Sequence, residues 1–102
     1  MNSHITNLYP KPTQQVTAME MLTVSNAVKQ FATSYSDRTK YITLDIQDND
    51  VYVTYTGETP SATTGHILYA GNSYTWSKAT ATAAKFIRVG GDAVIAASEF
   101  TE

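Results

Sequence analysis

Two alternating apolar runs, separated by three turn-forming residues, constrain the fold of this chain more than any other feature. The apolar positions are Ile42, Leu44 and Ile46 in the first run, and Val51, Val53 and Tyr55 in the second. A period of two is typical of a strand that buries one face. Because the intervening Asp48-Asn49-Asp50 tolerates turn conformations, we predict that residues 41–47 and 51–56 form a β-hairpin.

The aliphatic side chains of this hairpin need a second layer of structure. Burial of one such side chain is worth about 1.5–3 kcal/mol, and a single sheet would leave the row in water. We therefore predict that a second sheet covers residues 42, 44, 46, 51 and 53.

Two further pairs of strands are predicted toward the C-terminus. Residues 66–70 and 73–77 flank a Gly71-Asn72 turn and form a second predicted hairpin. Residues 85–89 and 92–98 flank Gly90-Gly91, two positions free to take positive φ, and form a third. Between these pairs, residues 78–84 fit either one short helical turn or a crossing loop.

Residues 18–33 are open to two interpretations. The segments 19–24 and 27–32 are β-prone, which favours two strands. A single helix across 18–33 is the alternative, because Ala, Met, Leu and Lys favour helix. Asn26 and the Thr and Ser residues weaken that helix.

The count is about eight short strands, spaced by turn signals. We therefore expect an all-β fold, an antiparallel β-sandwich or a jelly-roll-like arrangement, over residues 18–102. Residues 1–17 form an extended N-terminal arm in this prediction, because Pro10 and Pro12 keep them out of a central strand. Its apolar anchors for a neighbouring protein would be Ile5, Leu8 and Tyr9; a frayed terminus is the alternative.

Composition narrows the class of partner. The 102 residues suffice for one domain, 42% are hydrophobic, 16% are charged and the net charge is −2. The basic residues are scattered, which disfavours nucleic-acid binding. No run approaches the roughly 20 apolar residues of a membrane span, and the N-terminus lacks the pattern of a secretory signal. The absence of Cys excludes disulfides, thiolate chemistry and Cys-type zinc sites.

Catalytic and metal-binding patterns are not apparent. The two histidines, His4 and His66, are far apart in the sequence, and a zinc site would need three or four ligands. Asp48 and Asp50 resemble half of a calcium loop, without its twelve-residue frame. Most other acids fall in turns or at strand ends, where Asp is favoured for local hydrogen bonding. We predict no enzyme activity, no cofactor and no metal.

The aromatic residues are the other candidates for binding. Tyr52 alternates with Val51 and Val53, so it should lie on the outer face and contact a partner. Tyr74 and Trp76 share one face of a predicted strand. If exposed, these two rings would form a platform for a carbohydrate.

Residues 53–89 resemble a pattern that recurs in small tailed-phage proteins. A strand is followed by G-x-x-P-x-A-T-x-G, a short apolar strand, a Gly turn, another strand, a loop and a strand of F-I-R type. The matching residues are Gly57, Pro60, Ala62, Thr63, Gly65, Leu68, Gly71 and Phe86-Ile87-Arg88.

The resemblance implies a virion structural protein that decorates or cements a capsid. It implies a small β-sandwich, a homotrimer with an extended terminal arm, and the major capsid protein or another virion protein as partner. Such a protein would be assembled in the host cytoplasm and located on the capsid surface. The alternatives are a head–tail junction or head-fibre component and, from another class, a carbohydrate-binding β-sandwich module.

Overall fold

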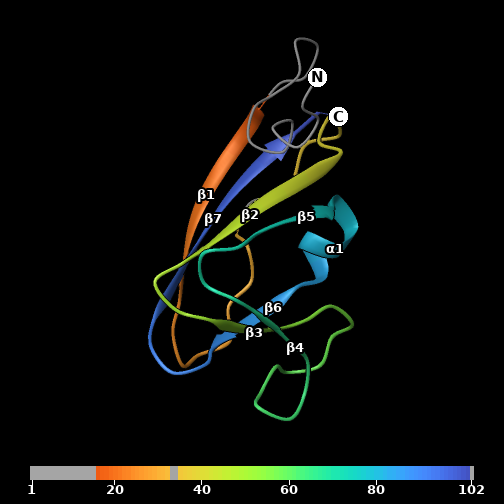
Figure 1. Cartoon of the computed structure of the whole chain (residues 1–102). Coiled ribbons are helices and arrows are strands. Elements are labelled where there is room, and N and C mark those ends of the chain that lie inside the picture. The colour runs from red at the N-terminus through yellow and green to blue at the C-terminus, as the bar shows by residue number, and fades with distance from the viewer. Residues whose placement is uncertain (1–15, 33–34, 102) are drawn as a thin grey trace, which may run out of the picture.

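The chain forms an all-β domain with two antiparallel sheets, as the alternating sequence predicts (Figure 1). The computed structural model describes residues 16–32 and 35–101. These ranges contain seven strands, where the sequence predicted about eight, and one short helix. The strands are β1 (Val16–Val24), β2 (Tyr41–Gln47), β3 (Val51–Thr54), β4 (His66–Leu68), β5 (Ser73–Ser77), β6 (Lys85–Arg88) and β7 (Ala93–Phe100), and the helix is α1 (Lys78–Ala83).

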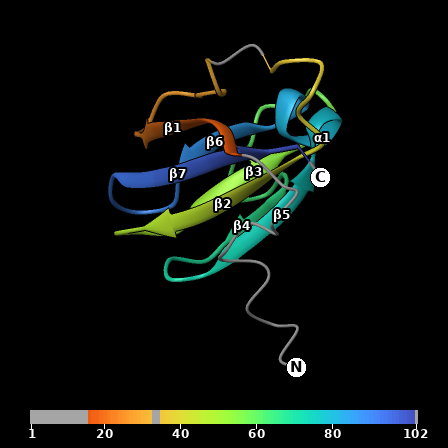
Figure 2. The ribbon, with the colours of Figure 1, turned by 90° about the horizontal axis from the view of Figure 1, so that it is seen from above.

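The two sheets differ in size and in the order of their strands. The larger sheet has the order β1-β7-β2-β5, and the smaller has the order β4-β3-β6. Seen from above, β1 lies at one margin of the larger sheet and β5 at the other (Figure 2). The smaller sheet presents one face to the core and the other face outward.

One hydrophobic core lies between the sheets and contains the predicted aliphatic row. The side chains of Ile42, Leu44 and Ile46 come from the larger sheet, and those of Val51 and Val53 from the smaller; all are essentially inaccessible to solvent. Phe86 of β6 is the largest fully buried side chain of this core. The five side chains are buried in one core as predicted, but they come from both sheets instead of from one hairpin that a second sheet covers.

All three predicted hairpins are wrong in their pairing. β2 pairs with β5 and β7, whereas β3 pairs with β4 and β6, so residues 48–50 connect the two sheets. The chain likewise crosses from one sheet to the other between β4 and β5, and between β6 and β7. Alternation shows which face of a strand is buried. It is equally satisfied whether the next strand lies beside the first or faces it across the core.

The crossing turns also use their residues differently from the prediction. Asp48 takes a φ of 73°, and Gly71 a φ of 87°. Neither Gly90 nor Gly91 has positive φ. Gly91 instead lies close to the first crossing turn, because a Cβ there would lie 2.7 Å from Nδ2 of Asn49.

The segment after β1 is neither the second predicted strand nor the alternative helix. β1 covers Val16–Val24, so the last two residues of the predicted arm belong to a strand. Residues 27–32 then make only an isolated bridge, in which Lys29 exchanges two backbone hydrogen bonds of 2.9 Å with Phe86. The segment runs beside β6 over the side of the core, and this tertiary position overrides its β propensity.

The helical turn predicted within 78–84 is present as α1. The hydroxyl of Ser77 caps it by accepting a hydrogen bond of 3.2 Å from the backbone N–H of Thr80. Ala81 and Ala84 pack into the core, so α1 closes the end of the larger sheet next to β5.

Candidate functional site

The large hydrophobic side chains that are exposed among the described residues fall into two groups. One group, Val16, Met19 and Met21, lies on β1. The other group belongs to the smaller sheet or to the segments next to it, and comprises Val28, Ile67, Tyr69 and Val89. Clustered apolar exposure indicates a binding surface more than scattered exposure does.

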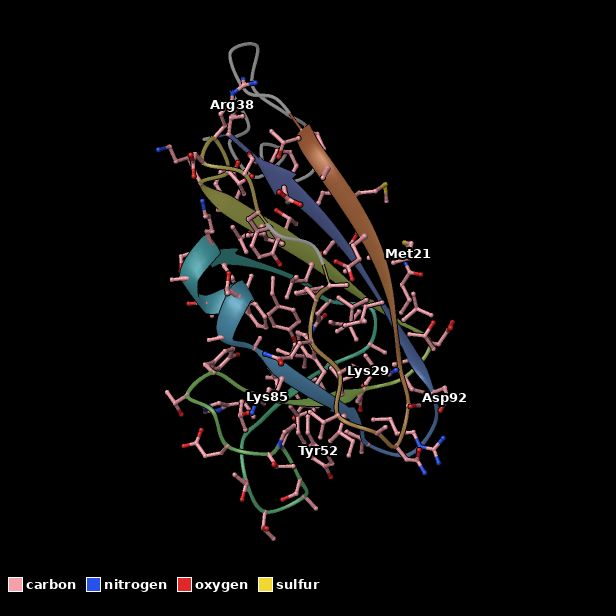
Figure 3. All side chains as sticks on the ribbon, turned by 180° about the vertical axis from the view of Figure 1, so that it is seen from behind. Met21, Lys29, Arg38, Tyr52, Lys85 and Asp92 are labelled. Carbon is pink, nitrogen blue, oxygen red and sulfur yellow. The ribbon has the colours of Figure 1, made fainter. Side chains whose placement is uncertain are left out.

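The second group surrounds Tyr52 at the centre of the smaller sheet. Tyr52 is directly opposite Ile67 of β4 and Ile87 of β6. Because the neighbouring Val51 and Val53 are fully buried, the alternation turns these three side chains away from the core. We call Tyr52, Ile67 and Ile87 the outer row. Figure 3 shows Tyr52 at this end of the molecule.

Aliphatic side chains extend the outer row on both sides of β6. Val89 continues the alternation of β6, and its N–H donates to the carbonyl of Asp50 at 3.2 Å. Lys29 forms an antiparallel bridge with Phe86. The preceding residue, Val28, therefore lies opposite Ile87 and on the same face. Lys85, opposite Thr54, supplies a charged margin. The prediction that Tyr52 lies on the outer face is confirmed, and sequence reasoning missed its neighbours because they depend on strand order.

A cleft of about 280 Å³ lies at the end of the smaller sheet. Its lining residues are Thr54, Tyr55, Thr56, Glu58, Thr64, Gly65 and His66. The hydroxyl of Thr56 donates to the Glu58 carboxylate, which lowers the pKa of that group. Lys85 Nζ donates to the carbonyl of Gly57 at 3.0 Å. The loop is therefore held by its own side chains, and the cleft is smaller than most small-molecule sites.

Trp76 and Tyr74, which would form a carbohydrate platform if exposed, are instead half-buried and face inward. Trp76 and Tyr74 are both packed against the core. The Trp76 ring lies 5.1 Å from the Tyr55 ring, edge to face, and 6.1 Å from the ring of Phe86. The Tyr74 hydroxyl is hydrogen-bonded to the N–H of Tyr69 at 3.0 Å.

A buried polar cluster ties β7 to the segment before β2. The hydroxyl of Thr39 donates to Oε1 of Glu99 at 2.9 Å, and both residues are buried. Burial first, and then the charges of Glu20 and Glu99, raises the pKa of Tyr35 to about 12. The sequence hint of this cluster is Glu99, an acid two residues after Ala97 and therefore on the inward face of β7.

The remaining candidates have local structural roles or lie outside the described residues. Asp50 accepts a hydrogen bond of 2.8 Å from the N–H of Ala70, so it holds the two crossing turns together. His66 lies beside Tyr55 with ring centroids 5.9 Å apart. The predicted arm contacts Ile5, Leu8 and Tyr9, and also His4, fall outside the described residues.

Within 16–32 and 35–101, no three His, Cys, Asp or Glu side chains gather closely enough to hold a metal ion. In the same ranges, no helix has the length and apolarity to span a membrane.

Comparisons with known proteins yield no relative for this chain. No family model matches it, no curated protein matches it, and no solved structure matches it. The kind of partner is therefore inferred from the residues of the outer row and its surroundings.

Proposed function

We propose that this chain is a virion structural protein that binds a capsid surface as a decoration or cement subunit. The outer row of the smaller sheet is its main contact with the major capsid protein. The observation that carries this proposal is the apolar surface around Tyr52, where Tyr52 is directly opposite Ile67 and Ile87.

The chemistry of the outer row suits a protein partner. An aromatic residue flanked by aliphatic ones is the usual centre of a protein interface, since it buries a large area at low cost in side-chain entropy. The phenol of Tyr52 can hydrogen-bond to a partner while its ring is covered. Lys85 at the margin supplies part of the polar rim of such an interface.

The resemblance to small tailed-phage proteins supports the virion location. The three glycines of the matching pattern take positive φ in this fold, with values of 97° at Gly57, 115° at Gly65 and 87° at Gly71. Pro60 of the same pattern is fully buried. The pattern therefore describes how the loop and strands of the smaller sheet are shaped, and this shape positions the outer row.

The copy number in purified particles tests the proposal. Mass spectrometry of particles from the source of this chain should find it in amounts comparable with the major capsid protein. A few copies per particle would indicate the head–tail junction or a head fibre instead. Complete absence from the particles would overturn a structural role in the virion.

Substitution of Tyr52 tests the contact surface itself. Particles depleted of the protein should rebind the wild type, and Tyr52→Glu should bind about 30-fold more weakly or worse, the loss of a hot spot worth at least about 2 kcal/mol. Thr75→Glu is the matched control, because Thr75 is an exposed, outward-facing strand residue of the other sheet. Unfolding midpoints of both variants identify any loss caused by misfolding. Equal binding by Tyr52→Glu, Thr75→Glu and wild type would refute the outer row as the contact.

A further inference from the structure

β1 is an edge strand of the larger sheet. It is nine residues long and, among the described residues, pairs with β7 alone. Natural edge strands are commonly protected by Lys, Pro, bulges or short length. β1 contains neither Lys nor Pro, and its one register shift lies at its first residues, between Val16 and Ala18.

The outward side of β1 is uncharged, with Met19, Met21 and Thr23 exposed. Met19 and Met21 are 64% and 55% exposed, and Figure 3 shows Met21 pointing away from the domain. Their opposite residues on β7 are Ser98 and Ala96. Glu20, the only charged residue of β1, lies on the core side, and its carboxylate accepts a hydrogen bond of 3.0 Å from the N–H of Ala32.

We propose that β1 pairs with β1 of a second copy of this chain, antiparallel and about a twofold axis, so that the two larger sheets become continuous. The occupant follows from charge. An uncharged strip gains nothing from a charged strand, whereas the same strip on a second copy is equally uncharged and offers methionines and a threonine to face its own. The net charge of −2 opposes such self-association only weakly.

The position of Glu20 selects the register. A twofold pairing centred on Glu20 would place two carboxylates opposite each other, which is destabilising. Centring on Met21 places Glu20 opposite Leu22 and Met19 opposite Thr23. It also pairs residues 18–24 and avoids the register shift near Val16. Met21 of one copy therefore faces Met21 of the other.

The small area of this contact makes it weak in solution. Seven residues at about 3.3 Å each give a strip about 23 Å long and about 10 Å deep, or about 230 Å² on each copy. The total of about 460 Å² is well below the roughly 1,200 Å² of a stable specific interface. The pair forms at high protein concentration, or where copies are held side by side on a surface.

Disulfide trapping tests the pairing on the free protein. Since the chain has no Cys, each single-Cys variant can cross-link only between copies. Opposed residues of an antiparallel pair lie within disulfide range. With an oxidant such as oxidised glutathione, Met21→Cys should form covalent dimers at least tenfold faster than Met19→Cys, which is the more exposed of the two and faces Thr23. Thr63→Cys, in an exposed loop, measures random collision.

The outcomes separate the alternatives. Equal rates for Met21→Cys, Met19→Cys and Thr63→Cys would overturn the pairing, and so would a sedimentation series that shows trimers. A monomer–dimer equilibrium that is lost in Met21→Lys supports it. Because no particles are used, failure here leaves the capsid contact of Tyr52 to be judged by its own binding assay.

Discussion

Replacement of Gly65 by Ala should destabilise the domain far more than the same change at Gly57. Both glycines have positive φ, 115° and 97°. Around Gly57 nothing lies within 4 Å of the position of an added Cβ. At Gly65 an added Cβ would press against the carbonyl oxygen of Val53 and lie 3.0 Å from Cγ2 of Thr54. Gly57→Ala is therefore a matched control that carries the backbone strain without the clash.

The expected magnitudes follow from these two environments. Left-handed backbone costs an L-residue about 1–2 kcal/mol, and the lower entropy of the unfolded Ala chain offsets about 0.4–1 kcal/mol of that. Gly57→Ala should thus lower the free energy of unfolding by about 1 kcal/mol. Gly65→Ala must also displace the backbone of β3, which adds about 1–3 kcal/mol, the usual cost of overpacking.

Urea unfolding followed by the fluorescence of Trp76 measures the difference. Trp76 is the single tryptophan and its ring stacks on the buried Phe86, so its emission reports on the core. With a urea dependence of about 1–3 kcal/mol per molar, the midpoint of Gly65→Ala should fall about 1 M below that of Gly57→Ala. Coincident midpoints would show that β4 can move away from β3 freely, and would refute the reasoning.

Two further predictions concern the buried polar cluster. Because the pKa of Tyr35 is raised from 10.0 to about 12 by burial and by Glu20 and Glu99, its stabilising contribution is complete below about pH 10 and is lost as the pH rises toward 12. Tyr35→Phe should make the alkaline loss of stability less steep over that range, and an identical pH profile would contradict this. Thr39→Val removes a donor from the buried carboxylate of Glu99 and should cost about 1–3 kcal/mol by urea unfolding. Thr75→Val, an exposed control, should change stability by no more than about 0.5 kcal/mol, and equal effects of the two Thr substitutions would exclude a role for the cluster.

The accessible surfaces were only partly predictable from the sequence. Alternation placed Tyr52 outward because its neighbours are aliphatic, and the structure agrees. It could not place Ile67 and Ile87 beside Tyr52, since those neighbours follow from the order β4-β3-β6. Nor could it distinguish the inward Trp76 from an exposed platform. An aromatic residue in an alternating strand suits either face until the opposite sheet is known.

Local sequence, through the period of two, predicted most of the strands and the side chains of the core, because these depend on each strand alone. Residues 27–32, also β-prone, form only an isolated bridge. Tertiary structure decided which strand lies beside which. The turn at residues 48–50, the Gly71-Asn72 turn and the Gly90-Gly91 turn all permit a reversal beside the strand or a crossing over the core. The crossing is selected because it buries the apolar rows of both sheets against each other. That same selection leaves β1 at an edge and Tyr52 on an open face, the two surfaces at which we propose that partners bind.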